Sequence, residues 1–319
     1  MHRPTPLVPL RYVALGATGP EDVVSDPEGR VFTGVSDGRV LRIDGLDDPA
    51  TARVVRVGET GGRPLGLELL PDGDLLVCDA YGALLHLDPD TGRTRVLAEE
   101  AAGEPLRFCS NVVALPDGSV YVTVSSRVHP LRDWIGDLVE HTGTGRLLRL
   151  GPDDKEPEVV LDGLQFANGL AASADGSALI VAETGARRLT RLRLTGPGAG
   201  SAEPLVEDLP GYPDNLWRAP GGPVWVALAG PRVPPLDLLH RADPSARRRA
   251  AALAVRAPYR PSGTIAVLAV DDEGRTVHHL RRRRSGFRMV TSVCEAAGHL
   301  VLGSLTEPGL AICEAPPTS

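Results

Sequence analysis

Polar side chains recur at one position of a repeated sequence pattern. Six turn signals of the form Pro/Ala-x-Gly punctuate the chain, with their glycines at positions 29, 73, 118, 176, 222 and 298. At a fixed distance before these glycines, where most buried strands would carry apolar residues, four of the six side chains are polar and two of them are carboxylates. Counting eight residues back from each glycine gives Glu21, Leu65, Ser110, Asn168, Asp214 and Val290, or Thr291 if the sixth repeat slips by one residue.

Carboxylate and amide oxygens in one ring favour a hard cation. Calcium takes about six to eight oxygen ligands from carboxylates, amide carbonyls and water. Glu21 and Asp214 together would balance a divalent charge, Asn168 would add a carbonyl oxygen, and Ser110 would add a hydroxyl or hold a water. No cluster of His and Cys falls in this register, which argues against structural zinc. The competing interpretation is that these groups cap strand ends in a wet channel.

The spacing of the turns predicts the elements that position this ring. Successive turn glycines lie 44, 45, 58, 46 and 76 residues apart, which gives a period of about 45 with insertions in two repeats. Each turn lies between short runs rich in Val, Leu and Ile, such as NVVALP and SVYVTVS, as expected of strands. Three or four strands at this period are typical of a propeller blade. We therefore predict one all-β domain over residues 1–319, a six-bladed β-propeller whose inner strands line a central channel.

Two insertions interrupt the period. Val128–Thr144 contains Trp134 and His129, and Leu236–Pro258 has helical periodicity with many Ala and Arg residues. Long insertions in a propeller lie at one face, where they can cover the channel mouth. We expect a lid-like helical insertion at about 236–258, with a surface helix packed on neighbouring blades as the alternative.

Composition narrows the classes of partner. The 319 residues carry a formal charge of -7, so the chain offers no global attraction for nucleic acid. Arg281–Arg284 is one of two basic clusters, and without interleaved aromatic residues it is interpreted as a solvated hairpin tip. The N-terminal residues show neither a spanning run nor a signal pattern. We expect a cytoplasmic protein with a small-molecule substrate and with neither a nucleic-acid nor a membrane partner.

Several segments resemble a known family. GPEDVVSDPEGRVFTGVSDGRVLRID, RPLGLELLPDGDLLVCDAYGALLHLD, LDGLQFANGLAASADGSALIVAET, LPGYPDNLW and VTSVCEAAGHLVLGSL are similar to the strictosidine synthase-like branch of the gluconolactonase/regucalcin superfamily. The resemblance implies a six-bladed propeller with calcium or another divalent metal in its channel. The family's metal-ligand motifs fall on Glu21 in GPED, Asn168 in FANG and Asp214 in PDN.

The chain also departs from that family. Relatives usually carry Asn-Asp or Asp-Asp where Ser110–Asn111 stands here, and an acid in the next strand where Val124 stands. The plant synthases of this family use a glutamate whose position aligns with Thr291. Amine–aldehyde condensation, the strictosidine synthase reaction, is therefore not expected.

The resulting hypothesis is a calcium-dependent hydrolase of a lactone or ester. Hydrolysis needs a base within hydrogen-bond reach of the attacking water. Asp79, Glu183, His129 and a metal-ligating carboxylate are the candidate bases. A non-hydrolytic cyclase or isomerase, and a non-catalytic binding propeller with a structural ion, are the alternatives. The predicted catalytic residues are Asn111, His129 and Glu183, and the predicted substrate-binding residues are Ser110, Trp134, Trp217 and Thr291.

Overall fold

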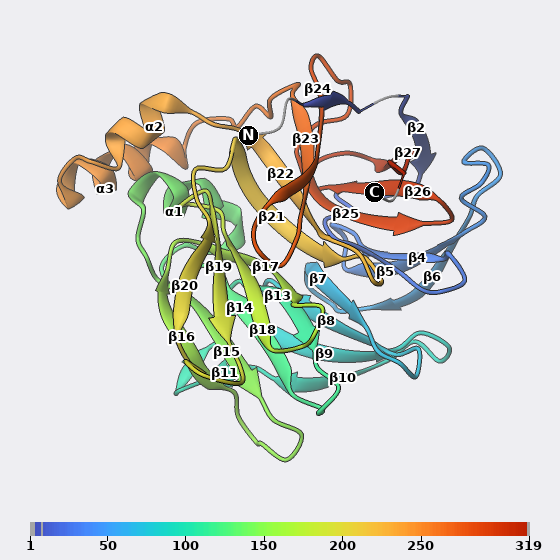
Figure 1. Cartoon of the computed structure of the whole chain (residues 1–319), viewed down its shortest axis with the longest axis horizontal. Coiled ribbons are helices and arrows are strands. Elements are labelled where there is room, and N and C mark those ends of the chain that lie inside the picture. The colour runs from blue at the N-terminus through green and yellow to red at the C-terminus, as the bar shows by residue number, and fades with distance from the viewer. Residues whose placement is uncertain (1–3, 8, 318–319) are drawn as a thin grey trace.

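The computed structural model describes residues 4–7 and 9–317 and shows a six-bladed β-propeller, as predicted (Figure 1). Each blade is an antiparallel sheet whose first strand contacts the first strands of the two neighbouring blades, so these six strands surround the channel. The first blade consists of β3 (Val23–Ser25), β4 (Val31–Gly34), β5 (Arg39–Asp44) and β6 (Arg53–Glu59). The second consists of β7 (Pro64–Leu69), β8 (Leu75–Asp79), β9 (Ala83–Asp88) and β10 (Arg93–Ala98). The third consists of β13 (Cys109–Ala114), β14 (Val120–Val124), β15 (Gly145–Leu150) and β16 (Glu158–Leu164).

The remaining blades complete the ring, and the N-terminal segment closes it. The fourth and fifth blades are β17 (Ala167–Ala172), β18 (Ala178–Glu183), β19 (Arg188–Arg193) and β20 (Ala202–Val206), then β21 (Gly211–Arg218), β22 (Val224–Pro231), β23 (Ile265–Val270) and β24 (Thr276–Arg282). The sixth has β25 (Val290–Ala296), β26 (His299–Ser304) and β27 (Gly309–Glu314), and takes its outermost strand from β2 (Arg11–Ala14), which pairs with β27. β1 (Thr5–Pro6) adds a parallel edge to β24, and β11 (Glu100–Ala101) pairs with β12 (Glu104–Pro105).

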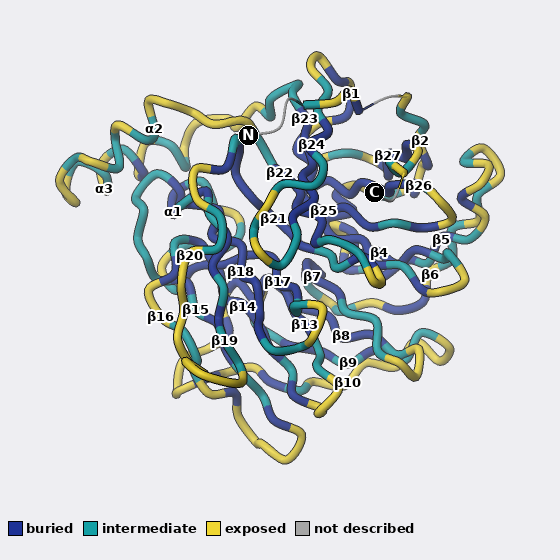
Figure 2. Tube along the Cα trace, in the orientation of Figure 1, coloured by how far each residue is buried: buried dark blue, intermediate teal, exposed yellow. Residues whose placement is uncertain are grey.

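The core lies in layers between adjacent blades. Inner strands are buried on both faces, whereas the outer strands and turns are exposed (Figure 2). In one such layer, Phe32 and Val40 of the first blade pack against Leu75 and Leu87 of the second. Because both faces of the sheets are covered, strands such as β8, β18 and β23 are buried along their whole length and read as near-continuous apolar runs.

Bulges interrupt the inner strands at the level of the predicted ring. The pairing register shifts between Cys109 and Val112, between Ala167 and Leu170, and between Pro213 and Leu216. A bulge inserts an extra residue and redirects side chains locally. Gly169 fills the extra position of the fourth blade because a Cβ there would lie 2.3 Å from the backbone nitrogen of Leu216.

The helices lie outside the blades, in the two insertions. The first insertion forms a 3-10 turn (Leu131–Asp133) followed by α1 (Trp134–Glu140). The second forms two helices, α2 (Pro234–Leu239) and α3 (Pro244–Ala254), where we had predicted one helical stretch at about 236–258. Pro244 separates the two helices, because a proline favours an extended conformation in the residue before it, here Asp243. In that conformation the side chain of Asp243 caps the start of α3. Of the helices described, none has the length and apolar character to cross a bilayer.

Candidate functional site

A cavity of about 480 Å³ lies over the mouth of the channel. Both insertions contribute to its walls, and the name lid is used below for residues 128–144 and 231–260. The floor is polar. Thr184, which directly follows β18, contributes to it, and five of its residues come from the ring: Glu21, Ser110, Asn168, Asp214 and Thr291. The walls are mostly apolar and aromatic: Leu65, Phe108, Leu131, Trp134, Ile135, Leu138, Phe166, Tyr212, Tyr259, Met289 and Leu305.

The sixth ring position is Thr291 rather than Val290. Val290 is fully buried in an apolar cluster between blades, whereas Thr291 lines the cavity. The register shift between Val290 and Ser292 turns Thr291 toward the channel. The one-residue slip itself comes from the turn, because two residues separate the paired Ala296 and His299, whereas six separate Ala172 and Leu179 in the fourth blade. The Thr291 hydroxyl donates to the backbone oxygen of Glu21 at 2.6 Å, which joins the last blade to the first.

The two carboxylates of the ring, Glu21 and Asp214, are buried, which makes their charged forms unfavourable. Burial raises the pKa of Glu21 to about 7, while the guanidinium of Arg63 and a hydrogen bond from Asn215 oppose that rise. Burial, with the nearby charge of Glu21, also raises the pKa of Asp214 well above its usual range. Oε1 of Glu21 accepts from Asn215 at 3.0 Å, but Oε2 is buried without a hydrogen-bond partner in the described part of the chain. A bound cation would relieve both costs.

Asn168 connects the ring residues on either side of it. Its Nδ2 donates to Oδ1 of Asp214 at 2.6 Å and to the Thr184 hydroxyl at 3.2 Å. Its Oδ1 accepts from the hydroxyl of Ser110 at 3.2 Å. These contacts hold three consecutive blades together at the cavity floor and fix the side chains that face the cavity.

A second set of polar residues occupies the next position along the inner strands. Asn111 Nδ2 donates to Asn215 Oδ1 at 3.0 Å, and Asp22 Oδ2 accepts from the backbone of Leu67 at 2.9 Å. Asn111, predicted to be catalytic, belongs to this set and does not line the cavity. The sequence carries a signal that we did not use: counting seven residues back from the first five turn glycines gives Asp22, Gly66, Asn111, Gly169 and Asn215.

Two of the predicted catalytic side chains and one predicted substrate-binding side chain have other partners. His129 pairs with Glu140 at 3.0 Å, and the fully buried Glu183 accepts from Arg188 and Thr190. Trp217 packs into three apolar clusters between blades. None of the three lines the cavity. The other predicted substrate-binding residues, Ser110, Trp134 and Thr291, and the predicted metal ligands Glu21, Asn168 and Asp214 do line it.

Asp79, the other candidate base, lies outside the cavity as well. Its Oδ1 accepts from the backbone nitrogen of Tyr81 at 2.8 Å at the end of β8. The structure therefore leaves Glu21 and Asp214 as the carboxylates that line the cavity in the described chain.

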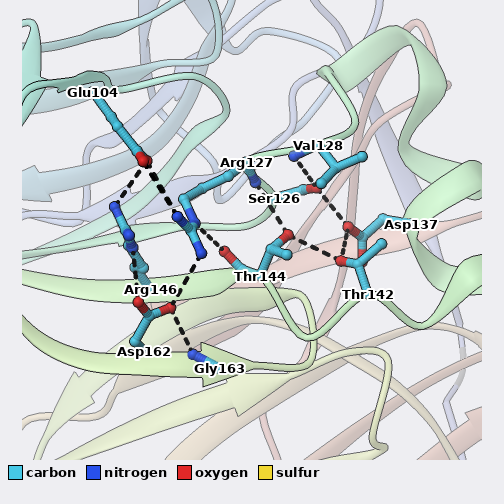
Figure 3. A network of polar contacts seen from close by, with 10 residues as sticks. All are labelled: Glu104, Ser126, Arg127, Val128, Asp137, Thr142, Thr144, Arg146, Asp162 and Gly163. Carbon is cyan, nitrogen blue, oxygen red and sulfur yellow. Dashed lines mark hydrogen bonds and ion pairs between the residues drawn. The ribbon is translucent and has the colours of Figure 1, made fainter.

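Hydrogen bonds around the buried Asp137 anchor the first lid segment to the third blade (Figure 3). Asp137 of α1 accepts from the hydroxyls of Ser126 and Thr142, and Thr142 also bonds Thr144 at 2.9 Å. Beside this cluster, Arg146 and Arg127 both pair with Glu104, and Arg146 also pairs with Asp162 (Figure 3). Because Asp137 is buried and its hydrogen bonds are made within the segment and to the blade, α1 has a defined position over the cavity.

Aromatic contacts join the two lid segments. Trp134 of α1 meets Tyr259 edge-on, with ring centroids 4.9 Å apart, and both rings line the cavity. At the other end of α1, His141 stacks on His240 at 4.0 Å, and His240 Nε2 lies 2.8 Å from the backbone oxygen of Leu138. The lid is therefore one packed unit, which covers the cavity from the side opposite the ring.

Strained backbone marks the wall residues that sequence analysis missed. Phe108, Phe166 and Met289 have left-handed φ angles of 57°, 59° and 48°. Each lies two residues before a ring residue, and each side chain lines the cavity. Non-glycine residues adopt this conformation rarely and cluster at functional sites. No single-sequence signal distinguishes these apolar residues from the core.

The arrangement suits an oxygen-ligated cation better than a zinc-type centre. In the part of the chain that the structure describes, no three His, Cys, Asp or Glu side chains converge as a metal site. The ring instead combines two carboxylates, an amide and hydroxyls, which are calcium-type donors. The four cysteines are free and buried, and they contribute nothing to the cavity.

Solved structures with the same fold include several enzymes. A gluconolactonase from Xanthomonas campestris superposes with a TM-score of 0.67 at 17% identity, over 96% of this chain and 89% of that one. A calcium-binding protein, regucalcin, from Agrobacterium tumefaciens gives 0.62 at 14% identity, over 94% and 90%. A luciferin-regenerating enzyme gives 0.64 at 14% identity, over 98% and 97%. At these identities the likeness establishes the fold.

Sequence relatives identify the family. The strictosidine synthase family matches residues 111–197, and the strictosidine synthase-like N-terminal family matches residues 6–43. Adipocyte plasma membrane-associated protein of Rattus norvegicus is 36% identical over 68% of this chain and 60% of its own length. Protein strictosidine synthase-like 10 of Arabidopsis thaliana is 32% identical over 93% of this chain and 85% of its own length. The chain therefore belongs to the strictosidine synthase-like family.

Proposed function

We propose that the protein is a hydrolase of a lactone or ester with an apolar body, and that calcium or a similar divalent ion at the ring supports the reaction. The observation that carries the proposal is Oε2 of Glu21, a buried carboxylate oxygen at the cavity floor with no hydrogen-bond partner in the described chain. Leaving such an atom unpaired costs free energy, which a cation would recover. The gluconolactonase and regucalcin with the same fold support this proposal by analogy.

The residues present fit the ion. Glu21 and Asp214 supply two negative charges, and Asn168 and Ser110 supply neutral oxygens on the same floor. We assign Glu21, Asn168 and Asp214 as the residues that would hold it. When bound there, such an ion would polarise a carbonyl oxygen and lower the pKa of a bound water.

The side chains of the lid and floor perform the remaining tasks. The aromatic walls, with Trp134 and Tyr259 at the lid side, bind the apolar body of the substrate and exclude water from it. Ser110 and Thr291 present hydroxyls at the floor and position the carbonyl group. Because the described cavity residues include no His, Lys or Cys, the proton of the attacking water passes to a carboxylate of the ring.

The decisive experiment combines metal removal with a choice of substrate. Hydrolysis of a γ-lactone with an alkyl chain is measured before chelation, after chelation and dialysis, and after calcium is restored. We expect turnover to disappear on chelation and to return with calcium. The alkyl lactone should also be preferred over gluconolactone, because the cavity walls offer few hydrogen-bond partners to a sugar. Turnover that survives chelation would reject the role of the metal.

The absence of a dedicated base favours one second candidate. With only ring carboxylates able to take a proton in the described cavity, the apolar enclosure also suits a cyclisation or isomerisation that uses no water. Mass spectrometry of the product separates the two reactions, since hydrolysis adds one water to the substrate and isomerisation leaves its mass unchanged. If no candidate substrate changes and calcium only raises the melting temperature, the protein is a binding propeller with a structural ion.

A further inference from the structure

Large apolar side chains are exposed on the lid. The name outward face of the lid is used below for the exposed residues Leu238, Arg241, Arg249, Leu253 and Arg256. Leu238 of α2 is 68% exposed and Leu253 of α3 is 70% exposed. On and just after α3, exposed residues recur at helical spacing, with Leu253 four residues after Arg249 and three before Arg256. In Figure 1, α2 and α3 project from one side of the propeller, beyond α1. Single exposed leucines are common on protein surfaces, so these two are informative only together with the charges around them.

The same face carries a concentrated positive charge. Residues 231–260 contain seven arginines and two aspartates, a formal charge of +5, so the remainder of the chain carries −12. Within the described chain, no hydrogen bond or ion pair occupies the guanidinium of Arg241 or Arg256, and Arg249 reaches only the hydroxyl of Ser245 at 3.4 Å. These arginines are exposed and free to bind an external anion.

The opposite end of the propeller is acidic. The turns that follow the inner strands lie at the far end of those strands from the cavity, and their exposed side chains include Glu28, Asp72, Asp117 and Asp175. The molecule therefore has a basic lid on the cavity side and acidic turns on the other. In the field of an anionic surface, this distribution turns the cavity side toward that surface.

We propose that the outward face of the lid docks onto an anionic phospholipid bilayer. Leu238 and Leu253 enter the interface between headgroups and acyl chains, and the arginines beside them bind lipid phosphates. Exposed apolar side chains flanked by arginines are the features of helices that lie on membrane surfaces. Our sequence-based expectation of no membrane partner considered spanning segments and overall charge, and a peripheral surface of this kind requires neither.

Docking would place the cavity next to the hydrocarbon interior of the bilayer, in which apolar esters and lactones dissolve. This consequence rests on the proposed function, whereas docking itself does not. The lid residues that bind lipid do not line the cavity, so the two properties can be tested separately.

The test is co-sedimentation of the full chain with vesicles. One set is pure phosphatidylcholine, and the other contains one-third phosphatidylglycerol. We expect binding to the anionic vesicles, weakened by added salt. Arg241→Gln with Arg256→Gln should lower the partition coefficient by about 25-fold, since each basic residue near an anionic surface contributes roughly a factor of five. Leu238→Ser with Leu253→Ser should lower it by at least about tenfold, because apolar groups no longer enter the interface.

The matched control is Arg95→Gln with Val96→Ser on β10, an exposed pair outside the lid; Val96 is 49% exposed. It should bind vesicles as the unmodified protein does. Circular dichroism and an unchanged melting temperature establish that the lid variants are folded, independently of any catalytic activity. Equal binding to neutral and anionic vesicles would overturn the proposal, as would binding that the lid variants leave unchanged. Retention on DNA or heparin without binding to vesicles would also overturn it.

Discussion

At the scale of single residues, the ring works through buried groups that would be unfavourable without a ligand. Glu21 and Asp214 are 5% and 7% exposed, and both have raised pKa values because burial penalises their charge. Asn168 links Asp214 to Ser110, since it donates to the carboxylate of Asp214 and accepts from the hydroxyl of Ser110. Such a constellation costs stability when nothing is bound, and this cost supports the proposed cation site.

Removal of one ring carboxylate should separate binding from stability. In Asp214→Asn we expect calcium affinity to fall by more than about tenfold, because a charged ligand is lost. The metal-free variant should melt at a higher temperature than the metal-free protein at neutral pH, because one buried charge is gone. Thermal unfolding with calcium and with chelator measures both effects.

The control for this variant is Asp175→Asn, at an exposed turn on the far side of the propeller. It should leave the calcium-dependent rise in melting temperature intact. An undiminished calcium effect in Asp214→Asn would show that the ion binds elsewhere.

This ring could be predicted from the sequence because residues at the same offset from successive turn glycines occupy equivalent positions around the propeller. Glu21, Asn168 and Asp214 share one register with the turn glycines, so their proximity follows from the period alone. His129 and Glu183 have no such constraint, and their pairing with Glu140 and Arg188 depends on how the insertion and the fourth blade pack. Trp217 lies five residues before its turn glycine, at the far end of β21, and that offset could have excluded it.

At the scale of elements, the lid depends on contacts between its two segments. α1 and α3 pack together, and the stacked His141 and His240 lie at the C-terminal ends of α1 and α2. Periodicity predicted helix in the second insertion, but Pro244 divides it, so the cavity is covered by a bent pair of helices instead of one rod. The local effect of proline was readable from the sequence, whereas the position of the pair over the cavity was not.

The histidine stack should make the lid sensitive to acid. Burial lowers the pKa of His141 to about 4, and the charges of His240 and Arg247 act in the same direction; Arg188 also lowers it and Glu183 raises it. An unfolded histidine titrates near 6.5. Between about pH 6.5 and 4 the unfolded chain therefore binds a proton that the folded protein does not, so this residue lowers stability as the pH falls through that window.

His141→Asn isolates this effect, because asparagine tolerates the left-handed backbone at position 141. Urea unfolding at pH 7 and at pH 4.5 should show a smaller loss of stability on acidification in the variant than in the unmodified protein. The difference between the two proteins is the measured quantity, since buried acids elsewhere titrate in both. Identical pH dependence would show that His141 is not held neutral by its surroundings.

At the scale of the whole molecule, the ring closes through β2. This strand pairs with β27, Arg11 opposite Ile312, and Val13 is buried in the layer between the sixth and first blades. Val13→Ala should lower the free energy of unfolding by about 2 kcal/mol, because it removes buried methyl groups at the closure. The same substitution at Val96, on an exposed outer strand, should change it by less than about 0.5 kcal/mol. Equal effects would mean that closure contributes little to stability.

The pairing of β2 with β27 also has a consequence for the order of folding. The ribosome releases β2 about three hundred residues before its partner β27. At typical synthesis rates of roughly 5–20 residues per second, β2 waits for at least about fifteen seconds. During that time five blades can form from local hairpins, while the ring stays open and an edge strand stays unpaired. The interval before closure is therefore the period in which a nascent chain is most exposed to mispairing, and chaperones would act on it there.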